Sequence, residues 1–182
     1  GIWWSLGEIG NRPLVLSELG ASAGLNLSLD RFSVAIDGVA HGPEDAIVQL
    51  VPEWRGALRP KPRPLNIVDR RGVDLAPLDA ADPEDALRLL AYLWPDQPER
   101  LTLTRAAIAV ASTLPDADDA APWLAQRLAK PCQGMLHVIY STIAAQYFPN
   151  ATQAAIADYL GKAGLSATPD APILHLALEA DA

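Results

Sequence analysis

A carboxylate followed by small residues at alternate positions is the feature of this sequence that most clearly predicts chemistry. Glu18 comes at the end of an apolar run that begins at Leu14. After it, every second position holds a small residue, namely Gly20, Ser22 and Gly24. A turn of this kind lets a ligand approach the backbone closely, while helix N–H groups point at the polar part of the ligand. The carboxylate disfavours a phosphate and favours a ligand that carries an ammonium or sulfonium group.

Two common nucleotide-binding motifs are absent from the sequence. The dinucleotide fingerprint G-x-G-x-x-G is not met, because Ser22 stands at its second glycine and Leu25 at its third. No G-K-[ST] sequence is present, which excludes a phosphate-binding loop for nucleoside triphosphates. Asn26 lies among Leu25, Leu27 and Leu29, and this pattern predicts that a short amphipathic helix follows the turn.

The elements around this turn predict an α/β fold. Besides 14–18, we expect strands at 65–74, 113–119, 134–140 and 173–178, and alanine-rich stretches between them predict helices. We expect a three-layer, Rossmann-like sheet that is largely parallel, with helices on both faces. With 182 residues, 50% of them hydrophobic, residues 1–182 are expected to form one domain, as a fragment of a longer chain.

Charge and composition exclude several classes of function. The net charge of −8 argues against a general nucleic-acid surface, so we expect a small-molecule substrate. No apolar run approaches the roughly 18 residues of a membrane span, and no signal peptide is evident. With the single Cys132, this predicts a cytoplasmic protein. His41 and His175 have no neighbours at metal-ligand spacing, so no metal is expected.

Longer strings in the sequence carry resemblances to known families. The spacing from Glu18 to Gly24 resembles the first motif of class I S-adenosylmethionine-dependent methyltransferases, with Ser22 in place of the middle glycine. The strings ELGASAGLN, LDRF, EWRG, RRGVDLAPLD and WPDQPER resemble a bacterial family known as domain of unknown function 2332. They span most of the chain. This resemblance implies a methyltransferase-like fold with no established reaction.

The methyltransferase resemblance implies a set of residues that bind S-adenosylmethionine. Glu18 would hold the methionine ammonium, and the backbone from Gly20 to Gly24 would pass beneath the cofactor, with Asn26 close by. Asp74 resembles the acid that binds both ribose hydroxyls, as two carboxylate oxygens suit two vicinal donors. Asp37 is the competing choice.

Two further positions complete this candidate site. Asp119 resembles the acid or amide that accepts the exocyclic amine of adenine, although Asp118 and Asp119 also suit the start of a helix. Ser141 and Tyr147 follow a central strand and are expected at the carboxyl edge of the sheet. If the methyl acceptor loses a proton, Tyr147 or a water held by Ser141 is the candidate base. His137 is expected to be a hydrogen-bonded core residue.

Local patterns predict the remaining elements. We expect a hairpin between 32–36 and 46–51, inserted after the first helix, and a helix that begins after Asp82. Asp96 with Glu99 predicts a capping box, and Asn150 predicts the start of a helix that ends at Gly161 and Gly164. The N-terminal residues, with Trp3 and Trp4, predict a helix, and 52–64, with Trp54 and Arg55, predicts a basic loop.

Two functions are consistent with these observations. The first is a methyltransferase that acts on a small molecule, in which alignment of the reactants supplies most of the acceleration. The second is a methyltransferase-like binding or scaffold module without turnover, which the altered glycine turn and the lack of a catalytic motif favour. A hydrolase that uses Ser22 or Ser141 lacks a G-x-S-x-G elbow.

Overall fold

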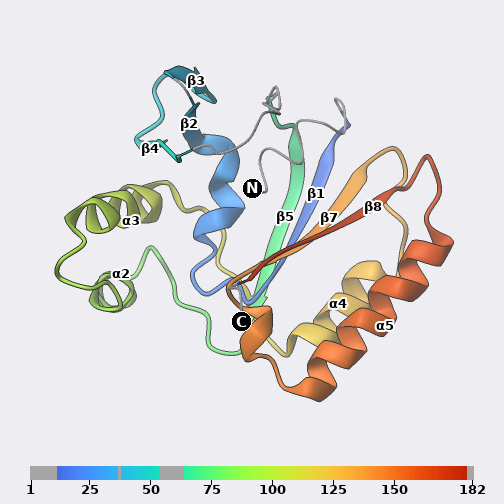
Figure 1. Cartoon of the computed structure of the whole chain (residues 1–182). Helices are drawn as coiled ribbons and strands as arrows, with labels where there is room; N and C mark the ends of the chain where they lie inside the picture. The colour runs from blue at the N-terminus through green and yellow to red at the C-terminus, as the bar shows by residue number, and fades with distance from the viewer. Residues whose placement is uncertain (1–11, 37, 54–63, 180–182) are drawn as a thin grey trace.

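Within the described residues, five strands form a parallel sheet at the centre of the molecule (Figure 1). The computed structural model describes residues 12–36, 38–53 and 64–179. The strands stand in the order β6–β5–β1–β7–β8, and every neighbouring pair is parallel. Their bounds are β1 Leu14–Leu19, β5 Ile67–Asp74, β6 Asp116–Ala117, β7 Leu136–Thr142 and β8 Ile173–Leu178. The predicted α/β fold with a largely parallel sheet is confirmed.

β1 is the central strand, and helices cover the sheet on both sides (Figure 1). All six of its residues are buried, as expected for a central parallel strand, and two of them, Ser17 and Glu18, are polar. Leu16 and its neighbours pack with the 3-10 helix η1 (Leu25–Arg31) and with α3 (Pro98–Val110). Leu19, on the opposite face, packs with α4 (Ala120–Leu128) and α5 (Asn150–Ser166). The core therefore has two halves, divided by the sheet.

η1 is fastened to the sheet by an arginine. Both terminal nitrogens of Arg70, on β5, donate to the carboxylate of Asp30, at 2.7 and 2.9 Å. One of them also donates to the carbonyl oxygen of Leu27, at 2.8 Å. A bidentate arginine–carboxylate pair of this kind fixes the relative orientation of the two side chains as well as their distance, so η1 is held in one orientation over β5.

A second, three-stranded sheet follows η1. β2 (Phe32–Ile36) pairs antiparallel with β3 (Val39–His41) and parallel with β4 (Val48–Leu50). The expected hairpin between 32–36 and 46–51 is therefore wrong. The chain reverses directly from β2 into β3 and occupies one edge of β2. The later strand then reaches only the other edge, where it runs parallel.

The helix that was expected to begin after Asp82 is confirmed as α2 (Pro83–Ala91). The Asp82 side chain accepts hydrogen bonds from the backbone N–H groups of Glu84 and Asp85, at 2.8 and 3.1 Å. The capping box expected at Asp96 is wrong, because α3 begins at Pro98 after Gln97, with no side-chain cap. Proline lacks an N–H and has a preset φ, which favours it at the first helical position.

α5 is longer than the sequence predicts. It begins at Asn150 with no side-chain cap and continues to Ser166, through both Gly161 and Gly164. The expected end at these glycines is therefore wrong. A glycine inside a helix costs about 1 kcal/mol relative to alanine. The packing of Ile156 and Leu160 against the α4 half of the core offsets that cost.

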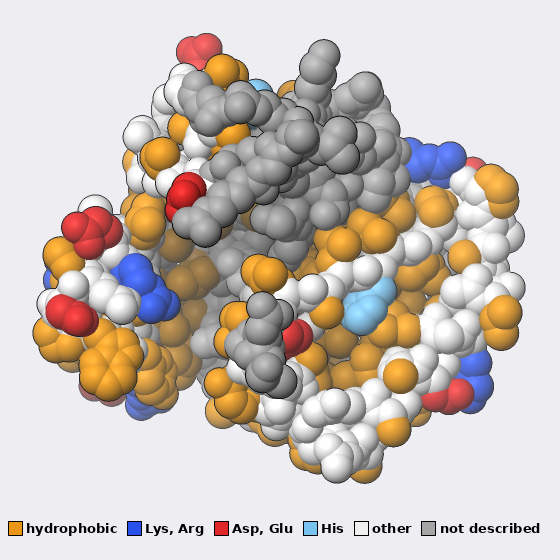
Figure 2. Space-filling view, viewed as in Figure 1, with side chains coloured by type: hydrophobic (Ala, Val, Ile, Leu, Met, Phe, Trp, Pro, Cys, Tyr) orange, Lys and Arg blue, Asp and Glu red, His pale blue; other side chains and the backbone are white. Residues whose placement is uncertain are grey.

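Several large apolar side chains of the α2 region lie outside both halves of the core. Leu87, Tyr92 and Trp94 are 68%, 72% and 71% exposed. Hydrophobic side chains gather at this end of the molecule, at the lower left of Figure 2. α2 itself contributes no buried residue. The stability of the fold therefore depends on the sheet and the helices that cover it, more than on α2.

We predict that Gly72→Ala destabilises the protein. A Cβ at Gly72 would lie 2.6 Å from the Cβ of Ala21 and 3.1 Å from a methyl carbon of Leu27. Overpacking of this kind costs about 1–3 kcal/mol, which urea unfolding can measure. Gly161→Ala is the matched control, since its Cβ meets nothing within 4 Å and should stabilise α5 by up to about 1 kcal/mol. Equal stabilities for the two variants would contradict this packing.

Candidate functional site

A cavity of about 320 Å³ opens at the carboxyl edge of the sheet. Its lining includes Gly20 after β1, Asp74 at the end of β5, Asp119 before α4, and Tyr147 after β7. Four of the residues that the sequence singled out are therefore brought to one cavity. The volume lies at the lower end of the range for small-molecule sites. Leu75, Ile143 and Phe148 also line it, so its walls are largely apolar.

The turn after β1 is held against β5 by the backbone. The N–H groups of Gly20 and Ala21 both donate to the carbonyl oxygen of Val73, at 2.9 Å. Gly20, Ser22 and Gly24 have φ values of 72°, 51° and 67°, in the left-handed region that favours glycine. The expected sharp turn is confirmed at these three positions.

The chain itself approaches the two glycines of the turn closely. A Cβ at Gly20 would lie 2.4 Å from the Cβ of Ala144, and one at Gly24 would lie 2.6 Å from the carbonyl oxygen of Thr113. Their small size is therefore required by internal packing, whatever ligand lies nearby. Gly20 still lines the cavity, beside Ala144.

The Asp74 carboxylate is half-buried at the cavity wall. One oxygen accepts a hydrogen bond from the N–H of Ser22 at 2.8 Å, and the other accepts one from the N–H of Ala76 at 3.0 Å. Each carboxylate oxygen has a second lone pair, which leaves capacity for two further donors. Asp74 thus orders the glycine turn and keeps acceptors for a ligand. Asp37, the competing choice, lies outside the described residues.

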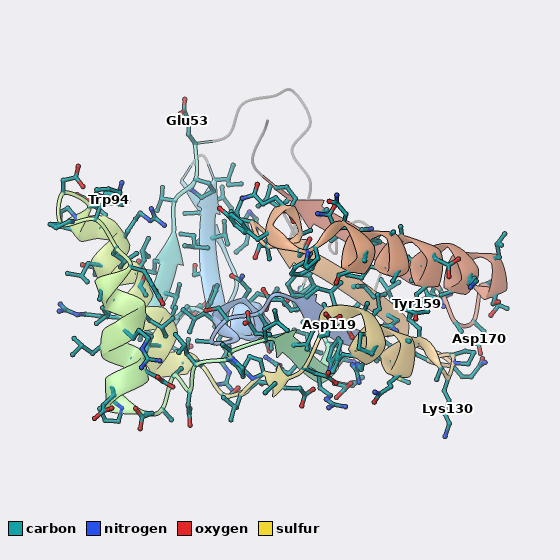
Figure 3. The ribbon with its side chains drawn as sticks, turned by 90° about the horizontal axis from the view of Figure 1, so that it is seen from below. Glu53, Trp94, Asp119, Lys130, Tyr159 and Asp170 are labelled. Carbon is teal, nitrogen blue, oxygen red and sulfur yellow. The ribbon has the colours of Figure 1, made fainter. Side chains whose placement is uncertain are left out.

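Asp119 begins α4 and also lines the cavity. Figure 3 shows it at the start of this helix, next to α5. One carboxylate oxygen accepts from the N–H of Ala121 at 2.8 Å, and the other lies 3.5 Å from the hydroxyl of Thr152. The helix-start interpretation is confirmed, and it does not prevent a ligand contact, because the cap uses one lone pair of four.

Glu18 does not line the cavity. Its side chain is only 1% exposed. One oxygen accepts from the side-chain amide of Asn26 at 2.9 Å, and the other from the Tyr140 hydroxyl at 3.3 Å. Burial raises the pKa of Glu18 from 4.5 to about 7, against the lowering effect of hydrogen bonds from Asn26, Tyr140 and Thr142. The ionised and protonated forms are therefore both populated near neutral pH.

The two candidate bases lie in different environments. Tyr147 is 76% exposed and lines the cavity. Ser141 is buried, and its hydroxyl donates to the carboxylate of Glu179 at 2.7 Å. The same carboxylate accepts from the N–H groups of Ala145 and Gln146, at 3.3 and 3.4 Å. Ser141 therefore helps to hold the cavity wall, and sequence reasoning missed Glu179, which follows β8.

The wall also contains a strained residue. Ile143 has a φ of 52°, a value that β-branched residues rarely adopt. Its N–H donates to the carbonyl oxygen of Leu178 at 2.7 Å. Such a conformation costs about 1–3 kcal/mol and persists where the surroundings impose it. The contacts from Leu178 and Glu179 supply that restraint and hold the wall from β8.

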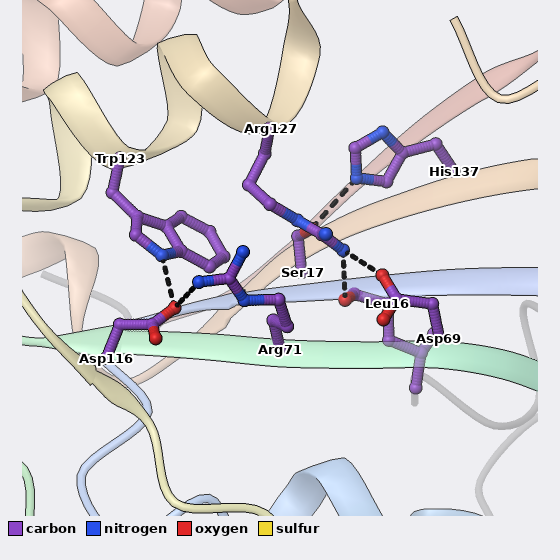
Figure 4. Close-up of polar contacts among 8 residues, drawn as sticks. All are labelled: Leu16, Ser17, Asp69, Arg71, Asp116, Trp123, Arg127 and His137. Carbon is purple, nitrogen blue, oxygen red and sulfur yellow. Dashed lines mark hydrogen bonds and ion pairs between the residues drawn. The ribbon is translucent and has the colours of Figure 1, made fainter. Parts of the chain in front are cut away.

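A polar network lies between the sheet and α4 (Figure 4). Arg127 donates to the Ser17 hydroxyl at 3.0 Å and to the Asp69 carboxylate at 2.7 Å. Its guanidinium also lies 5.7 Å from the ring centre of Trp123. Sequence reasoning missed this cluster, although Arg127 stands four positions after the buried Trp123 and so shares its helix face.

His137 belongs to the same network. Its Nε2 lies 2.8 Å from the Ser17 hydroxyl, and the residue is buried, so the expected core position is confirmed. Burial lowers the pKa of His137 from 6.5 to about 4, and the positive charge of Arg127 acts in the same direction. The imidazole is therefore neutral at physiological pH and serves as a hydrogen-bonding residue of the core.

Some expectations concern residues that the structure does not describe. Trp3, Trp4, Trp54 and Arg55 lie outside the described residues. Within the described ranges, no group of three or more histidine, cysteine, aspartate or glutamate side chains is arranged to hold a metal ion. None of the helices in those ranges has the length and apolar character that a bilayer crossing requires.

Comparison with known proteins places the chain in a bacterial family. The family model described as "Uncharacterized protein conserved in bacteria (DUF2332)" matches residues 1–182. The chain belongs to this family. No curated protein and no solved structure matches it. The family predicted from strings such as ELGASAGLN is thus confirmed, whereas a methyltransferase activity stays a prediction.

We predict that Glu18 and His137 give this family member opposite pH dependences of stability. The native state keeps the Glu18 proton that the unfolded chain loses above pH 4.5, so this stabilisation disappears as the pH rises to about 7. The unfolded chain protonates His137 below pH 6.5, so stability is lost as the pH falls to about 4. Each shift corresponds to about 3 kcal/mol, and the two effects offset each other between pH 4.5 and 6.5.

Glu18→Gln should therefore remove one of the two opposing effects. Relative to wild type, the variant should lose about 3 kcal/mol of unfolding free energy between pH 8 and pH 4.5, measured by urea titration at each pH. Glu44→Gln, at an exposed position, controls for the substitution itself. A constant difference between Glu18→Gln and wild type at every pH would contradict the shifted pKa of Glu18.

Proposed function

We propose that the protein binds S-adenosylmethionine at this cavity and transfers its methyl group to a small molecule. The observation that carries the proposal is the cavity itself, which brings Gly20, Asp74 and Asp119 together from three separate strand ends. The sequence assigned these residues to the backbone, ribose and adenine contacts of one cofactor. A cavity of largely apolar walls with a few convergent acceptors suits a nucleoside.

The sheet topology supports the same proposal. Counted along the main sheet, the strands stand in the order 3-2-1-4-5, and the order reverses at β1. This order matches the first five positions of the doubly wound order 3-2-1-4-5-6, in which ligands bind outside the carboxyl ends of the strands, at the point of reversal. The turn after β1 and the residues after β7 flank that point, and both line the cavity.

Each candidate residue would have a defined part in binding. The free lone pairs of Asp74 suit two vicinal ribose hydroxyls, and the carboxylate of Asp119 suits an exocyclic amine. Leu75 and Phe148 provide apolar surface for a planar base. When bound, S-adenosylmethionine supplies an electrophilic methyl group. The chain would align the acceptor with that group. If the acceptor loses a proton, the phenolate form of Tyr147, which is exposed on the wall, is the candidate base that receives it.

A binding module without turnover is the second candidate function. Two observations favour it: Ala144 lies directly against Gly20, and the Ser141 hydroxyl is engaged by Glu179. The first limits how deeply a cofactor sits over the turn, and the second removes one of the two candidate bases. Binding of S-adenosylmethionine without methyl transfer would support this alternative.

We predict saturable, micromolar binding of S-adenosylmethionine and S-adenosylhomocysteine, measured by isothermal titration calorimetry. Asp74→Asn should lower the affinity for both ligands by about tenfold or more, because a carboxylate acceptor for hydroxyl donors is lost. Asp158→Asn is the matched control: Asp158 is exposed on α5 and pairs with Lys162, and it does not line the cavity. Its affinity should equal that of wild type.

The same titrations can reject the proposal. No heat and no thermal shift with millimolar S-adenosylhomocysteine would contradict binding. Equal losses in Asp74→Asn and Asp158→Asn would contradict the assigned cavity. Mass spectrometry of S-adenosylhomocysteine production with a panel of small amines, carboxylic acids and phenols would then separate a methyltransferase from a binding module.

A further inference from the structure

The side chain of Asn26 is held in a defined orientation at the carboxyl edge. Its amide nitrogen donates both to Glu18, at 2.9 Å, and to the hydroxyl oxygen of Thr142, at 3.0 Å. An ionised carboxylate only accepts hydrogen bonds, so the nitrogen must face Glu18. The carbonyl oxygen of the same planar amide therefore points away from Glu18 and Thr142. Within the described residues, that oxygen has no hydrogen-bond partner, and the side chain is exposed.

Glu18 itself cannot meet a ligand in this arrangement. Its carboxylate is 1% exposed, with Asn26 on one oxygen and Tyr140 on the other. Of these groups, only Asn26 is exposed. A ligand that arrives at this end of the turn therefore meets the amide oxygen of Asn26 before it meets the carboxylate.

Asn26 belongs to η1, which follows the glycine turn, and it does not itself line the cavity. Thr142, its second partner, directly precedes Ile143 on the cavity wall. Asp74, on the opposite side of the turn, is close enough for its charge to raise the pKa of Glu18. For its other end to reach Asn26, a ligand whose nucleoside lies in the cavity must pass Ala144, which lies against Gly20, and follow the wall from Ile143 to Thr142.

We propose that the carbonyl oxygen of Asn26 accepts the ammonium group of the ligand, and that Glu18 is a positioning residue that orients this amide. The inference rests on the proposed function, since it takes the nucleoside to lie in the cavity. It changes the role assigned to Glu18, from direct ligand to support. It also defines the ligand class: a nucleoside that carries a primary ammonium group at the end opposite its base.

Two ligands separate this role from a general loss of structure. S-adenosylhomocysteine has the amino acid end, whereas 5′-methylthioadenosine has the same nucleoside and sulfur but lacks it. The titrations are made at pH 8, where Glu18 is mostly ionised. Asn26→Ala should lower the affinity for S-adenosylhomocysteine by about ten- to hundredfold, the usual effect of losing a hydrogen bond to a charged group. The same substitution should leave the affinity for 5′-methylthioadenosine unchanged. Asn66→Ala, at an exposed asparagine before β5, is the matched control.

The outcomes distinguish the inference from the function on which it rests. If wild type binds neither ligand, both fail. If wild type binds both, and Asn26→Ala binds S-adenosylhomocysteine equally well or more tightly, then Glu18 is the direct contact and this inference fails alone. An equal loss for both ligands would also overturn it, since it would show damage to the turn. Thermal unfolding of each variant confirms that the comparison is made on folded protein.

Discussion

A carboxylate buried at the end of the central strand is the constraint on which this edge of the molecule depends. Glu18 is enclosed between η1 and β7, and a buried charge is tolerated only when hydrogen bonds surround it. Asn26 and Tyr140 supply these bonds. Because one partner lies on η1 and the other on β7, satisfying Glu18 also fixes the segment after the glycine turn relative to the strand beside it. Burial still raises the pKa of Glu18, because these hydrogen bonds offset only part of the desolvation cost.

Carboxylates order the rest of the edge in the same manner. Asp74 binds the backbone of the glycine turn, Asp119 caps α4, and Glu179 holds the wall after β7. Each occupies backbone N–H groups that would otherwise be unsatisfied at the ends of elements. Asp74 and Asp119 also keep unused lone pairs at the cavity, so the groups that shape it are also able to bind a ligand. The Arg127 network lies between the sheet and α4, where Arg127 donates hydrogen bonds to Ser17 and Asp69.

The small residues of the glycine turn have two explanations, close approach of a ligand and close packing by the chain itself. Their spacing predicted a close ligand approach, yet Ala144 and Thr113 of the same chain already approach Gly20 and Gly24. The positive φ values favour glycine at Gly20 and Gly24, and the close approach of Ala144 and Thr113 leaves no room there for a Cβ. The motif is therefore sufficient to predict the turn and its place in the fold. Its ligand depends on the cavity beside it, which the arrangement of β5, β7 and α4 creates.

The sequence by itself determined the strands of the main sheet, the turn and the family, because residue patterns, turn residues and family strings are local properties of the chain. Helix ends at Pro98 and Ser166 and the pairing of β2 were not predictable in this way, since proline placement and packing against other elements decided them. Only the tertiary structure decided that Asp74, Asp119 and Tyr147 share a cavity while Glu18 lies behind Asn26. The physical reason is that side-chain direction and burial depend on neighbours distant in sequence, such as Tyr140 and Glu179, which no local pattern records.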